Sequence, residues 1–259
     1  MYKIAVITPC YNRAQFISEC IQSVSLSNTF GICEIEHIII DDASTDDTWN
    51  VIRQSKVPNL TVFRLTENKG PAFARNYAID QCDADFIFCL DSDDVLFQNS
   101  LFSLLTFILE KKADWAYGDI IRGDNRLRYQ IGKDFFGWNF KTIEDVLTAM
   151  FKNEHFFQHS SLFSKTAFDK AGRYDDSLHM AEDFDLFTRM LLRGYFPYYL
   201  SAPLYIYRVH DNNLSKPYFI NLKKHKEDIR ELYAKYKDEF QAILSKDSIT
   251  AIEQAHSTW

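Results

Sequence analysis

Three carboxylates stand within four residues directly behind a short apolar run. The run covers residues 86–90, and the residues that follow it are Asp91, Ser92, Asp93 and Asp94. Carboxylates this close repel one another, and a divalent cation held by oxygen ligands is a common way to offset that repulsion. The simpler interpretation is an acidic turn in which an aspartate caps the next helix. The spacing therefore predicts either a cation site or a helix cap.

A second acidic pair and one histidine are further candidates. Glu182 and Asp183 open a predicted helix, where acidic residues are favoured by the helix dipole, and a carboxylate there is also placed to act as a general base. His210 follows a predicted strand. A lone histidine is more often structural than a ligand, but its imidazole would complete a mixed nitrogen and oxygen sphere around a cation held by Asp93.

Polar residues also follow the first two predicted strands. Tyr11 could stack on a planar ring, and Asp42 could accept hydrogen bonds from a base or ribose. Arg75 lies on a helix that follows a strand, from which its planar guanidinium could reach phosphate. The structural alternatives are packing for Tyr11, a turn or cap role for Asp42, and pairing with a neighbouring carboxylate for Arg75.

Strands and helices alternate along the chain, which predicts an α/β fold with a mainly parallel sheet flanked by helices. The predicted strands cover residues 4–8, 37–40, 60–65, 86–90, 115–119, 157–163 and 204–209, and residues 9–12 are expected to form a loop. The predicted helices cover residues 16–24, 44–54, 71–82, 99–112, 143–151, 165–171 and 182–193. Residues 122–140 are predicted to be irregular or a hairpin. An apolar stripe after residue 217 predicts a helical tail.

Composition narrows the functional class. The chain has 259 residues, of which 46% are hydrophobic and 25% charged, and its net charge is −7. A packed α/β domain is expected, and the negative charge argues against a nucleic-acid-binding protein. The five cysteines are scattered without a Cys-x-x-Cys pair, so neither a zinc site nor a disulfide framework is indicated, and a reducing, cytoplasmic compartment is expected.

Seven motifs in order give the chain a specific resemblance. They are Val-Ile-Thr-Pro-x-Tyr-Asn-Arg, Ile-Ile-Asp-Asp-Ala-Ser-Thr-Asp-x-Thr, Asn-Lys-Gly-Pro-Ala-x-Ala-Arg-Asn, Leu-Asp-Ser-Asp-Asp, Phe-Asp-Lys-Ala-Gly-Arg-Tyr-Asp, Glu-Asp-Phe-Asp-Leu and Tyr-Arg-Val-His. Over about residues 3–215 the sequence resembles glycosyltransferase family 2. The resemblance implies the GT-A (Rossmann-like) fold and an inverting transfer of a sugar from a nucleotide sugar.

The resemblance also implies roles for the first three motifs. Pro9, Tyr11 and Asp42 would hold the nucleoside, most often uridine. Arg75 would lie near the base or the diphosphate. Residues 1–216 would form the GT-A domain, with a nucleotide-binding half over about 1–120, an acceptor-binding half over about 121–216, and a separate helical tail over 217–259.

The later motifs imply the chemistry. Asp91, Ser92 and Asp93 match the family's Asp-x-Asp motif, in which Asp93 would bind Mn²⁺ or Mg²⁺, Asp91 the ribose or the cation, and Ser92 would lie at the nucleotide. His210 resembles a late histidine that ligates the metal in some GT-A enzymes. Asp183 matches the usual catalytic base.

The acceptor is expected to be a glycan or lipid-linked sugar of a surface polysaccharide. Aromatic residues within 122–157, Trp138 among them, could stack on it, with Glu182 in support. Basic residues over 216–226 could rest on the inner face of a membrane, and the tail stripe could join two copies of the chain. The rival functions are a sugar-phosphate nucleotidyltransferase and a non-catalytic nucleotide-sugar-binding protein.

Overall fold

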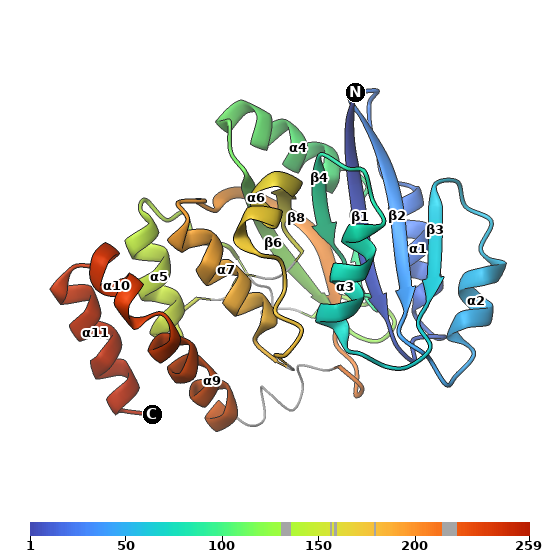
Figure 1. The fold of residues 1–259 in the computed structure, drawn as a ribbon. Coiled ribbons are helices and arrows are strands. Elements are labelled where there is room, and N and C mark those ends of the chain that lie inside the picture. The colour runs from blue at the N-terminus through green and yellow to red at the C-terminus, as the bar shows by residue number, and fades with distance from the viewer. Residues whose placement is uncertain (131–135, 156, 158–159, 179, 214–221) are drawn as a thin grey trace.

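An eight-stranded mixed sheet runs through the described part of the chain, with helices on both faces (Figure 1). The computed structural model describes residues 1–130, 136–155, 157, 160–178, 180–213 and 222–259. The strands lie in the order β3-β2-β1-β4-β7-β6-β8-β5. They are β1 (Tyr2–Cys10), β2 (Cys33–Asp41), β3 (Leu60–Arg64), β4 (Phe86–Cys89), β5 (Val95–Leu96), β6 (Trp115–Gly123), β7 (Leu162–Ser164) and β8 (Tyr198–Arg208).

Helices form a layer on each face of the sheet, which confirms the predicted fold class. One face is covered by α1 (Ile17–Ser25), α2 (Thr48–Gln54) and α4 (Ser100–Lys111). The other is covered by α3 (Pro71–Asp80), α5 (Ile143–Phe151), α6 (Lys165–Ala171) and α7 (Glu182–Leu192). The C-terminal helices α9 (Leu222–Lys235), α10 (Lys237–Ile243) and α11 (Lys246–Ser257) lie further from the sheet, with α9 and α11 against α5 (Figure 1). In β1, Ala5 and Ile7 face the second layer while Ile4 and Val6 face the first, because alternate residues of a strand point to opposite faces.

The first half of the sheet is parallel and the second half is mixed. β1 pairs in parallel with both β2 and β4, and β2 pairs in parallel with β3. β7 is antiparallel to β4 and to β6, which returns β6 and its parallel partner β8 to the direction of β4. The ends of β1, β2, β4, β6 and β8 therefore point to one edge of the sheet.

Several details differ from the sequence prediction. Pro9, expected in a loop, lies in β1, and β7 covers only the end of the predicted strand 157–163. β8 begins at Tyr198 rather than residue 204 and contains Pro203, which lies where the pairing with β6 shifts register and no ladder donor is required. β5 was missed because two residues are too short to show a pattern. The predicted irregular segment 122–140 lies partly outside the described residues.

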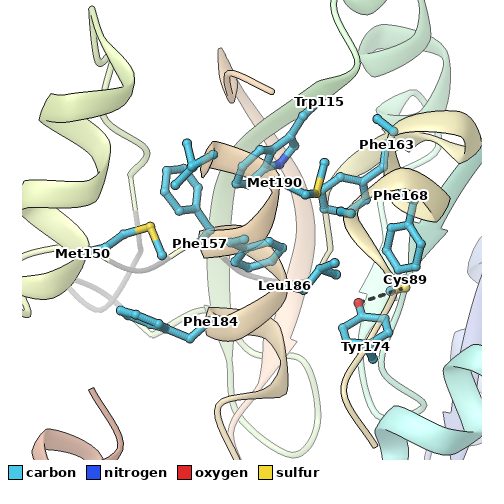
Figure 2. Close-up of a cluster of buried hydrophobic side chains, with 14 of the residues drawn as sticks. Cys89, Trp115, Met150, Phe157, Phe163, Phe168, Tyr174, Phe184, Leu186 and Met190 are labelled. Carbon is cyan, nitrogen blue, oxygen red and sulfur yellow. Dashed lines mark hydrogen bonds between the residues drawn. The ribbon is translucent and has the colours of Figure 1, made fainter. Parts of the chain in front are cut away.

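Aromatic side chains fill the space between α7 and the sheet (Figure 2). The Trp115 ring lies 5.1 Å from Phe157 and 5.1 Å from Phe187, measured between centroids. The Tyr174 hydroxyl lies 3.4 Å from the Cys89 sulfur, at the end of β4. This packing holds α7 against the strands that lead to the common edge.

The three C-terminal helices pack on the chain's own core. The predicted apolar stripe is buried at Ile229, Leu232, Tyr233, Tyr236 and Phe240, and only Ile243 of the stripe is exposed. The stripe is therefore covered within the chain and does not offer the surface for a second copy that the sequence suggested. Residues 214–221, which include Lys216 of the basic segment predicted to meet a membrane, lie outside the described residues, and Lys223, Lys224 and Lys226 of that segment lie in α9. Among the described helices, none has the length and apolar character needed to span a bilayer.

A buried histidine in β2 predicts how stability depends on pH. Burial lowers the pKa of His37 to about 3, from an unfolded value of about 6.5. The unfolded chain therefore takes up the proton first, and stability should fall as the pH drops below 6.5 towards 3. His37→Gln can keep the hydrogen bond to the Thr8 hydroxyl and should flatten this dependence. Urea unfolding at about pH 7.5 and about pH 5 measures how the free energy of unfolding changes with pH. The same change in His37→Gln as in the unaltered protein would contradict its assignment to His37.

Candidate active site

The first feature of the site is the edge where three parallel strands end. Cys10 at the end of β1 pairs with Asp41 at the end of β2, and Ile7 of β1 pairs with Cys89, the last residue of β4. The loops that follow these strands therefore leave the same edge, as the sequence predicted. In open α/β sheets, ligands bind beyond the carboxyl ends of the strands.

Asp93 is the centre of one polar cluster at this edge. Its Oδ2 accepts a hydrogen bond from Arg13 Nε at 3.0 Å and lies 2.9 Å from His210 Nε2. His210 is fixed by the amide of Asn212, which donates to Nδ1 at 3.1 Å, and by Phe16, whose ring centroid lies 4.5 Å away. Because Nδ1 accepts, the neutral imidazole carries its proton on Nε2 and donates it to Asp93.

Arg75 forms the second cluster. It is buried, and its guanidinium donates to Asp91 Oδ1 at 3.1 Å and to Glu182 Oε1 at 3.0 Å. The same group lies 5.3 Å from the centroid of the Tyr174 ring. The Arg75 guanidinium thus joins the acidic loop after β4 to the first turn of α7. This is the carboxylate pairing that the sequence left open for Arg75.

A third arginine holds the acidic loop from the other side. Arg208, at the end of β8, is 1% exposed; its Nε donates to the Asp93 carbonyl at 2.7 Å, and its amide donates to Asp94 Oδ1 at 2.9 Å. It also pairs with Glu19 of α1. Burial, followed by the nearby charges of Asp93 and Asp91, raises the pKa of Asp94 well above its ordinary value. Arg208 therefore fixes the backbone and one side chain of the loop.

Asp42 organises the loop between β3 and α3. Its two carboxylate oxygens accept hydrogen bonds from the amides of Lys69 and Gly70, each at 2.8 Å. Burial raises the pKa of Asp42, although these amide hydrogen bonds act against the shift. Gly70 has φ +86°, a conformation that favours glycine, and Pro71 then begins α3. Asp42 thus fixes the turn from which Arg75 is presented.

The remaining predicted residues lie in different settings. Pro9 is buried in β1, Tyr11 is 42% exposed, and Ser92 is buried beside Cys10. Asp183 is half-buried, and its Oδ1 accepts from the amide of Phe184 at 2.7 Å. Trp138 is 46% exposed, with its carbonyl bound by the Tyr117 hydroxyl and its ring 5.2 Å from that of His155. These contacts place Trp138 in an aromatic group distinct from the two acidic clusters.

Sequence reasoning assigned no role to Arg13 or Arg208, although both stand in motifs that it used. The available signal was the excess of carboxylates, because each buried carboxylate needs a cation or several donors. The pairing could not be read from the sequence, since Arg208 and Asp93 are 115 residues apart.

The buried position of Arg75 leads to a stability prediction. Arg75→Met would leave Asp91 and Glu182 without their shared partner, and should lower the free energy of unfolding by about 3–5 kcal/mol. Arg128→Met is a matched control, because the Arg128 side chain is 74% exposed and pairs with Asp124 at the surface. Chemical denaturation of both variants measures the difference. Equal stability of Arg75→Met and the unaltered protein would contradict the proposed role of the ion pairs.

Comparison with solved structures supports the fold. The crystal structure of residues 1–349 of Staphylococcus aureus TarS in complex with UDP-GlcNAc superposes with a TM-score of 0.68 at 20% identity, covering 98% of this chain and 79% of that one. The likeness extends beyond the sheet to nearly the whole chain.

Similar sequences are glycosyltransferases of bacteria. Glycosyltransferase GlyG of Streptococcus pneumoniae is 26% identical over 239 residues, which are 83% of this chain and 74% of that protein. UDP-Glc:alpha-D-GlcNAc-diphosphoundecaprenol beta-1,3-glucosyltransferase WfaP of Escherichia coli is 27% identical over 231 residues, which are 86% of this chain and 83% of that protein.

The family match covers the part of the chain that holds the acidic loop. The family model described as Glycosyl transferase family 2 matches residues 5–172, from β1 through α6. This match spans well over half of the chain and includes Arg13, Arg75 and the aspartates after β4. It favours a transferase over the nucleotidyltransferase considered from the sequence, and the chain belongs to glycosyl transferase family 2.

Proposed function

We propose that this chain transfers a sugar, with inversion, from a uridine nucleotide sugar to a hydroxyl of a glycan or lipid-linked acceptor. The observation that carries the proposal is the meeting of the acidic loop with α7 at one sheet edge, where Arg75 binds both Asp91 and Glu182. Asp183 stands next to Glu182, so a candidate base lies beside the candidate donor site.

The donor site is proposed at the loops after β1, β2 and β4. Tyr11 is exposed at this edge and offers a ring face to the base, while Pro9, Asp42 and Ser92 shape the surrounding backbone. The Arg75 guanidinium binds carboxylates, so it is not proposed to contact the diphosphate directly. Its proposed effect is to hold Asp91, which lies between Arg75 and the diphosphate. The uridine assignment draws on WfaP, named for UDP-Glc, and on the UDP-GlcNAc bound to TarS.

The donor atoms at Asp93 fit a divalent cation of the Mn²⁺ or Mg²⁺ class. One carboxylate and one imidazole meet there, and among the described residues no group of three or more histidine, cysteine or acidic side chains converges. Such ions commonly take one or two protein ligands and fill their other positions with water and substrate phosphate. Asp93 and His210 would hold the ion, which would offset negative charge on the leaving diphosphate. For this, His210 would have to move its proton from Nε2 to Nδ1 and give up the hydrogen bond from the Asn212 amide. Arg13 now occupies the same carboxylate oxygen and would have to give it up.

The transfer itself needs a base opposite the leaving group. The acceptor oxygen bonds to the anomeric carbon while the bond from that carbon to the diphosphate oxygen breaks, and the acceptor proton passes to the Asp183 carboxylate. A carboxylate is a weak base towards an alcohol, so the proton moves late, once the new bond has begun to form. Asp183 is half-buried in the first turn of α7, where Glu182 is already paired with Arg75 and so remains a supporting group.

The acceptor is proposed to be a lipid-linked or polymeric glycan at the cytoplasmic face of a membrane, in the synthesis of a surface polysaccharide. The names of WfaP and of the poly(ribitol-phosphate) transferase TarS support this class. Trp138 offers a half-exposed indole face on which a sugar ring can stack.

Replacing the proposed base should separate catalysis from binding. Asp183→Asn keeps the shape of the side chain but removes the base, so transfer should fall by about 10²- to 10⁴-fold while the affinity for UDP is kept. Asp176→Asn, at an exposed position, is the matched control. Turnover assays with calorimetry of UDP binding test this, and near-normal turnover by Asp183→Asn would reject the assignment.

The cation proposal predicts a metal-dependent loss of nucleotide binding. Asp93→Ala removes the central ligand and should abolish the gain in UDP affinity that Mn²⁺ brings to the unaltered protein. Asp83→Ala, whose side chain is fully exposed, should keep that gain. Calorimetry with and without Mn²⁺ measures the difference, and an intact metal effect in Asp93→Ala would rule out this cation site.

A further inference from the structure

A buried carboxylate in the first turn of α7 is held by the C-terminal tail. Asp185 has no exposed surface, and its Oδ1 accepts from the Tyr236 hydroxyl at 2.6 Å and from Lys235 Nζ at 2.8 Å. Its Oδ2 accepts from Arg189 Nε at 2.8 Å. Tyr236 follows the last residue of α9, about fifty residues further along the chain.

The partners of Asp185 connect the start of α7 both to the end of α6 and to the C-terminal tail. Arg189 lies one turn further along α7, and its guanidinium also donates to the carbonyls of Ala171, the last residue of α6, and of Arg173, two residues later. Tyr236 is 6% exposed, so its hydrogen bond to the carboxylate is shielded from water. Buried hydrogen bonds to a charged group are the stronger ones, and their loss leaves the carboxylate under-compensated.

The first turn of α7 is thus fixed at two points. Glu182 is held by Arg75 from the side of the sheet, and Asp185 is held by the tail. Asp183 stands between these two anchors in the sequence. Ala181, directly before the helix, has φ +67°, a left-handed conformation that a non-glycine residue adopts only when its surroundings enforce it. The position of Asp183 therefore depends on the contacts made by its two neighbours.

We infer that Tyr236, assisted by Lys235, is a positioning residue for the base, so that the tail is part of the catalytic apparatus. This rests on the proposed role of Asp183. Apolar contacts already attach the tail, since the Phe151 ring lies 4.8 Å from that of Phe240 and Ile229 is buried. Apolar packing is not directional, whereas the hydrogen bond from Tyr236 to Asp185 fixes the orientation of the first turn of α7.

The test compares two hydroxyl deletions, one at Tyr233 in the last turn of α9 and one at Tyr236 directly after it. Tyr236→Phe removes the donor to Asp185, whereas Tyr233→Phe removes a hydroxyl that faces Glu253 of α11, and both tyrosines are about equally buried. Tyr236→Phe should lower kcat by about 10- to 100-fold, since small misplacement of a catalytic group is costly. Its donor KM and UDP affinity should stay within about twofold. Tyr233→Phe should leave all three unchanged.

Hydrogen exchange gives a readout that does not depend on catalysis. Peptides covering residues 181–187 should exchange faster in Tyr236→Phe than in Tyr233→Phe, while peptides of the sheet stay protected. If Tyr236→Phe does not fold, Lys235→Met offers a milder deletion, because the Lys235 side chain is 45% exposed. It should lower kcat in the same direction, and Lys235→Arg should restore it.

The outcomes separate this inference from the proposed function. Equal kcat and equal exchange in the two tyrosine variants, with Asp183→Asn inactive, would overturn the inference and leave the base in place. Equal losses in both tyrosine variants would also overturn it, since the effect would then be general loosening of the tail. Full turnover by Asp183→Asn would overturn both.

Discussion

Mutual repulsion among Asp91, Asp93 and Asp94 is the constraint around which the site is built. Three carboxylates within four residues cannot be buried together without compensation. The chain supplies one arginine to each part of the loop: Arg75 binds Asp91 and Arg13 binds the side chain of Asp93. Arg208 binds the Asp94 carboxylate through its amide and the Asp93 carbonyl through its guanidinium. These arginines come from α3, from the loop after β1 and from β8, so the loop takes its shape only when the sheet is assembled.

The same charges explain how the site accepts its proposed ligands. The Asp93 carboxylate also meets the imidazole of His210, and Arg13 lies on the oxygen that a cation would take. In the proposed function, a metal and a diphosphate would take the place of arginine in balancing the charge of the loop. The guanidinium released from Asp93 would then be free to bind phosphate oxygens, for which its planar fork is suited.

Local sequence patterns were sufficient to predict most of the helices and strands, and to predict that the strand ends lie at one edge of the sheet. Five apolar residues before Asp91 mark β4, and Ile38 to Ile40 mark β2, because strands buried on both faces read as apolar runs. The same reasoning missed β5 and the start of β8, where pairing across the sheet overrides weak local signals. It found the carboxylates and placed His210 with Asp93, but it missed the arginine partners of Asp93 and Asp94, because Arg13 and Arg208 approach through long-range contacts. It separated the tail from the catalytic domain, whereas Tyr236 binds Asp185 of α7.

Diffraction from crystals soaked with UDP and Mn²⁺ tests the central claim most directly, because manganese can be located by its anomalous scattering. The account predicts a manganese peak bound to Asp93, with the diphosphate on its far side, the uracil against Tyr11 and Arg13 withdrawn from the carboxylate. A manganese peak and nucleotide bound elsewhere on the protein, or nucleotide at the edge with Arg13 still on Asp93 and no metal, would contradict it.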